Sequence, residues 1–178
     1  NHMVSPMHDM KYLTAYPDEL KLQVQRLIDE KQLGAVLLKK YPSSHQVRTD
    51  SALYQYVLDL KNAYIRNARP LSKVVYVNDM RVLQRALCTH TVASRVQGHK
   101  LKSKSEIRIA ALFKNVPAEF LRMIVVHELA HLKEKEHNKA FYNLCVSMEP
   151  AYLQVEFDLR LYLTHVDLFG ELAWGEAT

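Results

Sequence analysis

The sequence predicts an α+β fold in which a small antiparallel sheet is flanked by helices. Apolar residues recur at helical spacing over residues 11–70, β-branched and aromatic residues concentrate in residues 71–112, and helical spacing returns over residues 117–168. No Gly- or Pro-rich stretch separates these parts, and no internal repeat occurs. We therefore expect residues 4–178 to form one domain and interpret residues 1–3 as an expression-vector remnant.

Two helices are expected in the N-terminal part. The first begins with the Pro-Asp-Glu sequence of residues 17–19 and stops at Gly34, because Gly commonly follows the last helical residue. The second is capped by Thr49 or Asp50 and ends at Arg69-Pro70, where the proline cannot continue the helix.

The middle of the chain has the composition of strands. Residues 74–77 read Val-Val-Tyr-Val, Asn78-Asp79 supplies turn residues, and Val82-Leu83 continues the apolar pattern, which predicts a hairpin. Further strands are expected at residues 91–96 and 106–110, the second of which alternates polar with apolar residues.

The C-terminal part is predicted to hold three helices. Pro117 suits the start of the first, and residues 120–132 are apolar around most of the helix circumference, which predicts a buried helix. Asn138 can cap the second, Glu149-Pro150 stops it, and the third covers about residues 151–168.

Composition excludes several functional classes. No Gly-rich phosphate loop occurs, and no apolar run approaches the roughly 20 residues of a membrane span. The N-terminus lacks the features of a signal peptide, so we expect a cytoplasmic protein. Cys88 and Cys145 form no CxxC pair. The net charge of +5 permits anionic partners, nucleic acid included, but does not select one.

The sequence His-Glu-Leu-Ala-His at residues 127–131 is the most informative pattern. On a helix, His127 and His131 are one turn apart and project from the same face, so both imidazoles can bind one metal ion. Glu128 lies beside them and can reach a water on an open coordination position, as the general base of a zinc hydrolase does. A bound dication would also offset the cost of burying these polar groups. We therefore predict a Zn²⁺ site, although another divalent transition metal would also suit the pattern.

A catalytic zinc site needs a third protein ligand, for which two residues compete. His137 lies six residues beyond His131, and Glu149 lies eighteen beyond it. The spacing favours His137, on the condition that the helix ends near Lys133, because an unbroken helix would carry His137 about 9 Å away. Asn138 supports such a break, since it can begin a new helix.

Basic residues precede the motif and are candidates for substrate binding. Arg95 and Arg108 fall in expected strands, where their guanidinium groups could grip phosphate. Three lysines lie between them, at positions 100, 102 and 104. A transition-state hydrogen-bond donor should also exist, for which the sequence offers Tyr142, Arg160, Tyr162 and His165 without ranking them.

The segment from Arg122 to Tyr142 resembles the YgjP-like metallopeptidases, a family also described as UTP-pyrophosphatase-like metal-dependent hydrolases. The resemblance extends over about residues 12–165 and includes the Val-His-Glu-Leu-Ala-His-Leu sequence of residues 126–132. It implies a zincin-like fold with the motif on a buried helix. It also implies that His127, His131 and His137 are the metal ligands, with Glu128 as the catalytic carboxylate.

Three functions are compatible with these residues. The first is a zinc-dependent hydrolase with a peptidase-type site that acts on peptides. The second is a nucleoside triphosphate pyrophosphatase, for which UTP is the substrate that the family's description suggests and the basic residues would neutralise phosphate. The third is a zinc protein without enzymatic activity, associated with DNA.

Overall fold

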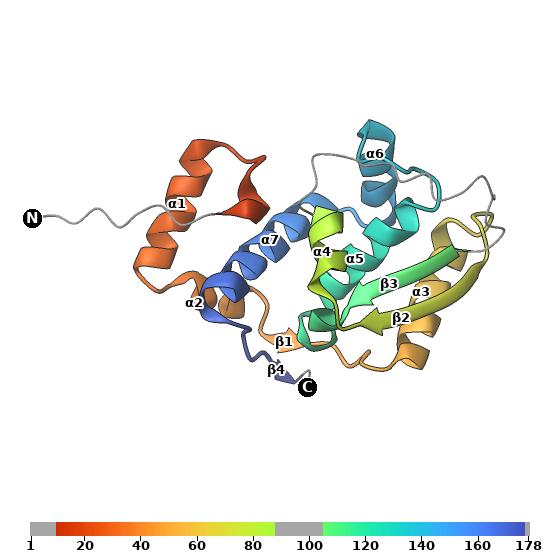
Figure 1. Ribbon diagram of the computed structural model, residues 1–178, viewed down its shortest axis with the longest axis horizontal. Coiled ribbons are helices and arrows are strands. Elements are labelled where there is room, and N and C mark those ends of the chain that lie inside the picture. Colours follow the sequence, from red (N-terminus) through yellow and green to blue (C-terminus); the bar gives the residue numbers. More distant parts are fainter. Residues whose placement is uncertain (1–9, 88–104, 177–178) are drawn as a thin grey trace, which may run out of the picture.

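The computed structural model describes residues 10–87 and 105–176 (Figure 1). In chain order its elements are the 3-10 helix η1 (Lys11–Leu13), α1 (Asp18–Asp29), α2 (Leu33–Lys40), β1 (Ser43–Ser44), α3 (Asp50–Tyr64), β2 (Leu71–Val77), α4 (Met80–Leu87), β3 (Ser105–Ala110), the 3-10 helix η2 (Ala111–Asn115), α5 (Ala118–Ala130), α6 (Lys139–Met148), α7 (Tyr152–Phe169) and β4 (Gly175–Glu176). The chain thus combines helices with short strands, as an α+β fold requires.

The first predicted helix is divided into α1 and α2. Helix α1 begins directly after Pro17, as expected, but ends at Asp29, and Lys31 takes a positive φ of 56°. Gly34 lies within α2 and does not stop a helix, so that prediction was wrong. The glycine instead permits close packing, because a Cβ at this position would lie 3.0 Å from Nε2 of His165 on α7.

Helix α3 begins as predicted and ends early. The side chain of Thr49 accepts a hydrogen bond from the backbone N–H of Ala52, so Thr49 is the cap. The Asp50 carboxylate instead accepts a hydrogen bond from the backbone N–H of Tyr76 on β2. The helix ends at Tyr64, before Arg69-Pro70, and the intervening residues lead the chain into β2.

The sheet formed by β2 and β3 is parallel, which corrects the expectation of an antiparallel sheet. Its register runs from Leu71 opposite Ser105 to Val77 opposite Ala110. The predicted hairpin at residues 74–83 does not exist, because α4 follows β2. The carboxylate of Asp79 accepts a hydrogen bond from the backbone N–H of Arg81, so the Asn-Asp pair begins a helix and does not close a turn.

The remaining strand pair consists of β1 and β4, which are also parallel and bring the C-terminal end of the described chain against residues 43–44. The strand expected at residues 91–96 lies outside the described residues.

Helix α5, which carries the motif, is packed against α3, α6, α7 and β3 (Figure 1). Phe120, Met123, Val125 and Val126 are all 0% exposed, because neighbouring elements cover the helix on several sides. Asn138 caps α6 by accepting a hydrogen bond from the backbone N–H of Phe141, as predicted. The motif is therefore held on a helix that a strand and three other helices contact.

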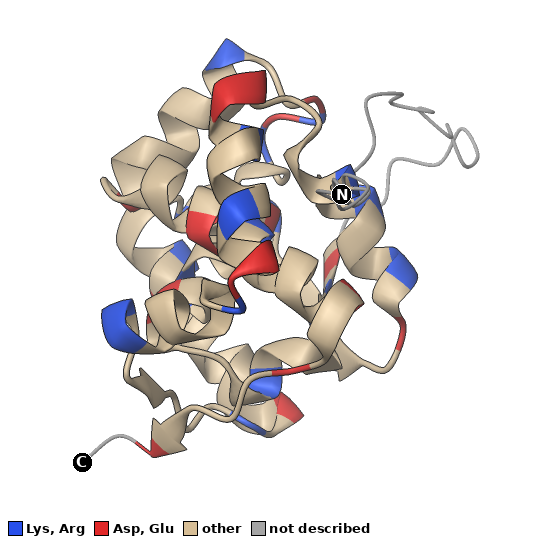
Figure 2. Ribbon diagram, turned by 90° about the vertical axis from the view of Figure 1, so that its left-hand side faces the viewer, with Lys and Arg blue, Asp and Glu red and all other residues tan. Residues whose placement is uncertain are grey.

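The charged residues do not segregate in the view of Figure 2, where Lys and Arg are interspersed with Asp and Glu. Among the helices of the described residues, none combines the length and apolar character needed to cross a membrane.

Candidate metal centre

The chain reverses direction directly after the motif. Helix α5 ends at Ala130, three residues before the expected end at Lys133, and His131 is its C-cap. The turn is held by the backbone N–H of Glu134, which donates to the carbonyl of Ala130 at 2.9 Å. Because α6 then starts from Asn138, His137 lies at the junction and its imidazole returns toward the end of α5.

Three imidazoles converge at this point. Nε2 of His131 lies 3.2 Å from Nε2 of His127 and 3.0 Å from Nε2 of His137. One ligand nitrogen from each ring lies within 4.8 Å of the others. Nitrogens bound to one tetrahedral zinc ion at ordinary bond lengths are about 3.3 Å apart. The two separations that involve His131 therefore match a single bound ion, and the nitrogens of His127 and His137 lie within 4.8 Å of each other.

Glu149, the alternative third ligand, is not part of this group. Its Oε1 atom forms an ion pair with Nε of Arg122 at 3.2 Å, and its Oε2 atom accepts from the backbone N–H of Ala151 at 3.3 Å. The carboxylate is therefore engaged at the junction between α6 and α7.

The second nitrogen of two rings is hydrogen-bonded away from the centre. Nδ1 of His131 lies 2.9 Å from the backbone carbonyl of Glu134, which can only accept, so this nitrogen carries the proton. Nδ1 of His127 lies 2.9 Å from the hydroxyl of Tyr152. These contacts leave the Nε2 lone pairs facing one another, and a bound cation would remove their mutual repulsion.

The electrostatic environment keeps the three imidazoles neutral. Burial lowers the pKa of His127 well below its ordinary value, and the neighbouring histidines lower it further. Burial also lowers the pKa of His131, and it lowers that of His137 to about 4. A neutral imidazole is the form that binds a metal, and three imidazoles suit divalent transition metals, zinc included.

Glu128 lies next to the three histidines, here called the triad. It lines a cavity of about 580 Å³, here called the Glu128 cavity. Burial raises the pKa of its carboxyl to about 7. The cavity extends between α4, β3 and the end of α5, and its walls are formed by Val77, Asp79, Val82, Arg85, Ala86, Glu106, Arg108, His127, Glu128 and His131. A substrate in this cavity would meet the carboxylate and two of the three imidazoles.

Of the two arginines predicted to bind substrate, Arg108 lines the Glu128 cavity. Its guanidinium lies 3.4 Å from the carboxylate of Glu106 and remains largely exposed. Arg95 and the lysines at 100, 102 and 104 lie outside the described residues.

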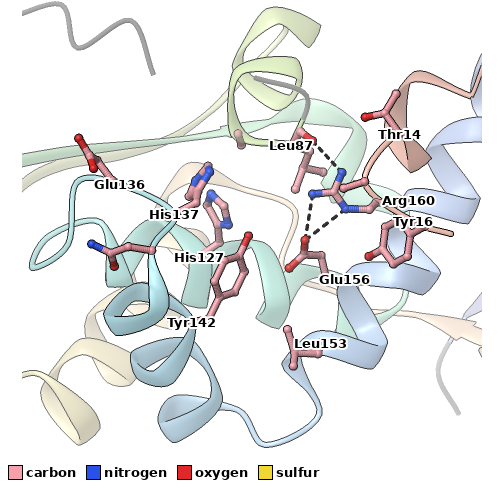
Figure 3. Close-up of a pocket in the computed structure, with 13 residues that line it drawn as sticks. Thr14, Tyr16, Leu87, His127, Glu136, His137, Tyr142, Leu153, Glu156 and Arg160 are labelled. Atoms are coloured by element: carbon pink, nitrogen blue, oxygen red, sulfur yellow. Dashed lines mark hydrogen bonds and ion pairs between the residues drawn. The ribbon is translucent and has the colours of Figure 1, made fainter. Parts of the chain in front are cut away.

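A second cavity, also of about 580 Å³, is lined by His127 and His137 and is here called the Glu156 cavity (Figure 3). His127 and His137 form one part of its wall, and Tyr142, Glu156 and Arg160 form another. Of the four candidate transition-state donors, Tyr142 and Arg160 therefore lie near the centre. Among the residues that line the two cavities, Tyr162 and His165 are absent.

The chain is similar to known proteins over most of its length. Residues 75–162 match the YgjP-like metallopeptidase domain. This range contains the three histidines and Glu128. The protein named UTP pyrophosphatase from Escherichia coli (strain K12) is 60% identical over 162 residues, which cover 91% of this chain and 97% of that protein. The chain belongs to the YgjP-like metallopeptidase family. No solved structure gives a significant match.

This membership confirms the resemblance inferred from the motif. As a member of the YgjP-like family, the chain is a metal-dependent hydrolase. Its three-histidine group is one that could hold a metal ion.

Two polar residues near the three histidines were missed by sequence reasoning, namely Tyr152 and Glu156 on α7. Both fall in a largely apolar helix and are 0% and 7% exposed. The available signal was the Glu156 and Arg160 pair, because two opposite charges four residues apart in a buried helix are unusual.

Proposed function

We propose that the chain is a zinc-dependent pyrophosphatase that hydrolyses UTP or a closely related nucleoside triphosphate to the monophosphate and pyrophosphate. The observation that carries this proposal is the 60% identity, over nearly the whole chain, to a protein named UTP pyrophosphatase. The metal ligands would be His127, His131 and His137. When bound, zinc would polarise the attacking water and neutralise phosphate charge.

Glu128 would act as the general base. Its carboxylate accepts a proton from water as the water oxygen forms a bond to the α-phosphorus. The bond between that phosphorus and the bridging oxygen breaks, so pyrophosphate leaves and the monophosphate remains. The proton passes from Glu128 to the leaving group or to solvent, which restores the carboxylate for the next turnover.

Arg108 would bind the phosphates. It lines the Glu128 cavity and stays exposed apart from its contact with Glu106, so its guanidinium can turn toward an anion. Arg95 would assist it, and the geometry of that residue lies outside the described part of the chain.

Peptide hydrolysis is the second candidate, and strand β3 is the observation that favours it. Within the described residues, β3 pairs only with β2, and its residues Glu106 and Ile107 line space next to Glu128. An extended peptide could add to the free edge of β3 and present its carbonyl to the same centre.

A zinc protein that binds DNA without catalysis is the third candidate function.

The deciding experiment compares zinc-loaded wild-type protein with Glu128→Gln on UTP, other nucleoside triphosphates and casein. We expect UTP cleavage by the wild type, with a fall of about 10² to 10⁴ in the variant and unchanged zinc content. Casein cleavage with inert nucleotides would replace this proposal by the peptidase function. Tight DNA binding with neither activity would favour the third function.

A further inference from the structure

The Glu156 cavity contains a buried carboxylate oxygen without a hydrogen-bond partner among the described residues. Nε and Nη2 of Arg160 both donate to Oε1 of Glu156, at 3.2 and 2.9 Å. Oε2 of the same carboxylate is buried and accepts no hydrogen bond from the described chain. A buried acceptor of this kind is costly unless a donor reaches it.

The unpartnered oxygen is held in a fixed position. Arg160 is itself anchored, because its Nη1 atom donates to the backbone carbonyls of Tyr12 at 2.9 Å and Leu87 at 2.7 Å. The guanidinium therefore ties Glu156 to two other segments of the chain. Figure 3 shows Glu156 between Arg160 and Tyr142, with its second oxygen directed away from Arg160. An acceptor that is already oriented loses little entropy when a ligand binds.

Two aromatic side chains line the same cavity. The ring of Tyr16 packs on Phe157 with a centroid distance of 5.1 Å, and that of Tyr142 packs on Phe141 at 5.2 Å. Both rings are thereby fixed by their neighbours. Tyrosine faces next to a hydrogen-bond acceptor are suited to a flat heterocycle, which stacks on the ring and donates from its edge.

The cavity also reaches the metal centre, because His127 and His137 are part of its wall. A ligand that fills it therefore extends from the triad to Glu156. The phosphate chain of a nucleotide carries acceptor oxygens and offers no donor to Oε2 of Glu156, whereas its charge is attracted to the metal. The neutral base is the part that can enter the cavity as far as Glu156.

We propose that the Glu156 cavity binds the base of the nucleotide and that Oε2 of Glu156 accepts a hydrogen bond from the ring N3–H of uracil. This assignment rests on the proposed function as a UTP hydrolase. Cytosine has a lone pair on N3 in place of that N–H, and adenine has a lone pair on N1 at the matching edge of its ring. Either lone pair would face the carboxylate oxygen. Glu156 is then the residue that distinguishes uracil from cytosine and adenine.

The direct test measures binding of UMP and of its N3-methyl derivative by titration calorimetry, which requires no turnover. For the zinc-loaded wild type we expect methylation to weaken binding by at least about tenfold, because the donor is removed and the methyl group meets a buried acceptor. Glu156→Gln should bind the two ligands with similar affinity. Equal affinities in the wild type, no UMP binding, or a preference that persists in the variant would each overturn the proposal.

A second measurement uses catalytic specificity. In Glu156→Gln, the amide oxygen can accept from Arg160 while the amide nitrogen donates into the cavity, which suits the N3 lone pair of cytosine. The ratio of kcat/KM for UTP to that for CTP should fall at least about tenfold. The control Glu171→Gln alters an exposed residue outside both cavities and should leave the ratio unchanged. An unchanged ratio in the Glu156 variant would overturn the proposal.

The two proposals fail in different ways. If UMP binding depends on N3–H but UTP is not hydrolysed, the base subsite stands and the proposed function fails. If UTP is hydrolysed and methylation has no effect on UMP binding, the proposed function stands and the subsite fails.

Discussion

Nδ1 of His127 lies 2.9 Å from the hydroxyl of Tyr152, although the two residues are on different helices. The hydroxyl also contacts the thiol of Cys145 on α6, and burial raises the pKa of Tyr152 far above its ordinary value, so the phenol stays protonated. The hydroxyl can therefore accept from His127 and donate to sulfur. This contact orients the imidazole that enters the triad from the most buried side.

We predict that Tyr152→Phe lowers zinc affinity by about 10- to 100-fold, because the ring is kept while the acceptor for His127 is lost. Competition with a chromogenic chelator measures this affinity. Tyr162→Phe is the matched control, since Tyr162 is another buried tyrosine of α7 whose hydroxyl accepts from the backbone N–H of Leu172. Unchanged zinc affinity in the Tyr152 variant would show that the contact does not support the site.

The identity of the third ligand gives a second prediction. His137→Ala should lower zinc affinity by more than the roughly 10- to 100-fold expected for loss of an outer contact, because it removes a donor atom itself. Glu149→Gln should retain full zinc content, since the Glu149 carboxylate is paired with Arg122. Zinc per chain after dialysis, measured by atomic absorption, distinguishes the two. Loss of zinc only in the Glu149 variant would reverse the assignment.

The local part of the fold was predictable from the sequence because its signals act over a few residues. Thr49 and Asn138 each cap the helix that was expected to follow them, and the four-residue spacing of His127 and His131 places both rings on one side of α5. The turn that returns His137 to the end of α5 contains no Gly or Pro, so the turn residues did not predict it. The prediction rested on Asn138, which can cap a new helix.

The strand pairing could not be read in the same way. Asn78-Asp79 fits a hairpin turn and a helix start equally well. The outcome depends on whether β2 pairs with the residues that follow it or with β3, whose Ser105 pairs with Leu71, 34 positions earlier in the chain. Tyr152 and Glu156 share this difficulty. Each has the spacing of a core residue on α7, and its polar role depends on where α5 and the N-terminal residues lie.

A third prediction concerns Arg108. Arg108→Ala should lower kcat/KM for UTP by roughly tenfold, mainly through KM, because the guanidinium contributes charge-assisted hydrogen bonds to phosphate. The effect should shrink at high salt, since the side chain is exposed and its charge is screened. Steady-state kinetics at two ionic strengths test both statements. Arg26→Ala, on the exposed side of α1, is the control and should leave the kinetics unchanged.

A fourth prediction concerns pH and the segment that leads into α5. His45 is buried, and its Nδ1 atom accepts from the backbone N–H of Val47 at 2.9 Å, so Nε2 carries the proton and donates to the carbonyl of Phe113 at 2.6 Å. Burial lowers the pKa of His45 below the ordinary 6.5. The folded state therefore holds a neutral imidazole that the unfolded chain would protonate first.

Because the unfolded state binds the proton more readily, the contribution of His45 to the free energy of unfolding is fully present above about pH 6.5 and declines as the pH falls below it. At pH 7.5, His45→Gln should be less stable by about 1–3 kcal/mol, since at least one buried hydrogen bond is weakened. Urea unfolding at a series of pH values measures the difference between the two proteins. The histidines that both proteins share cancel in this difference. The difference in the free energy of unfolding should therefore narrow between pH 6.5 and 5. A difference that widens toward low pH would contradict a neutral His45 in the folded state. The result bears on the metal centre because Phe113 and Val116, which His45 anchors through its ring and its backbone, lead directly into α5 and set where His127 and Glu128 lie.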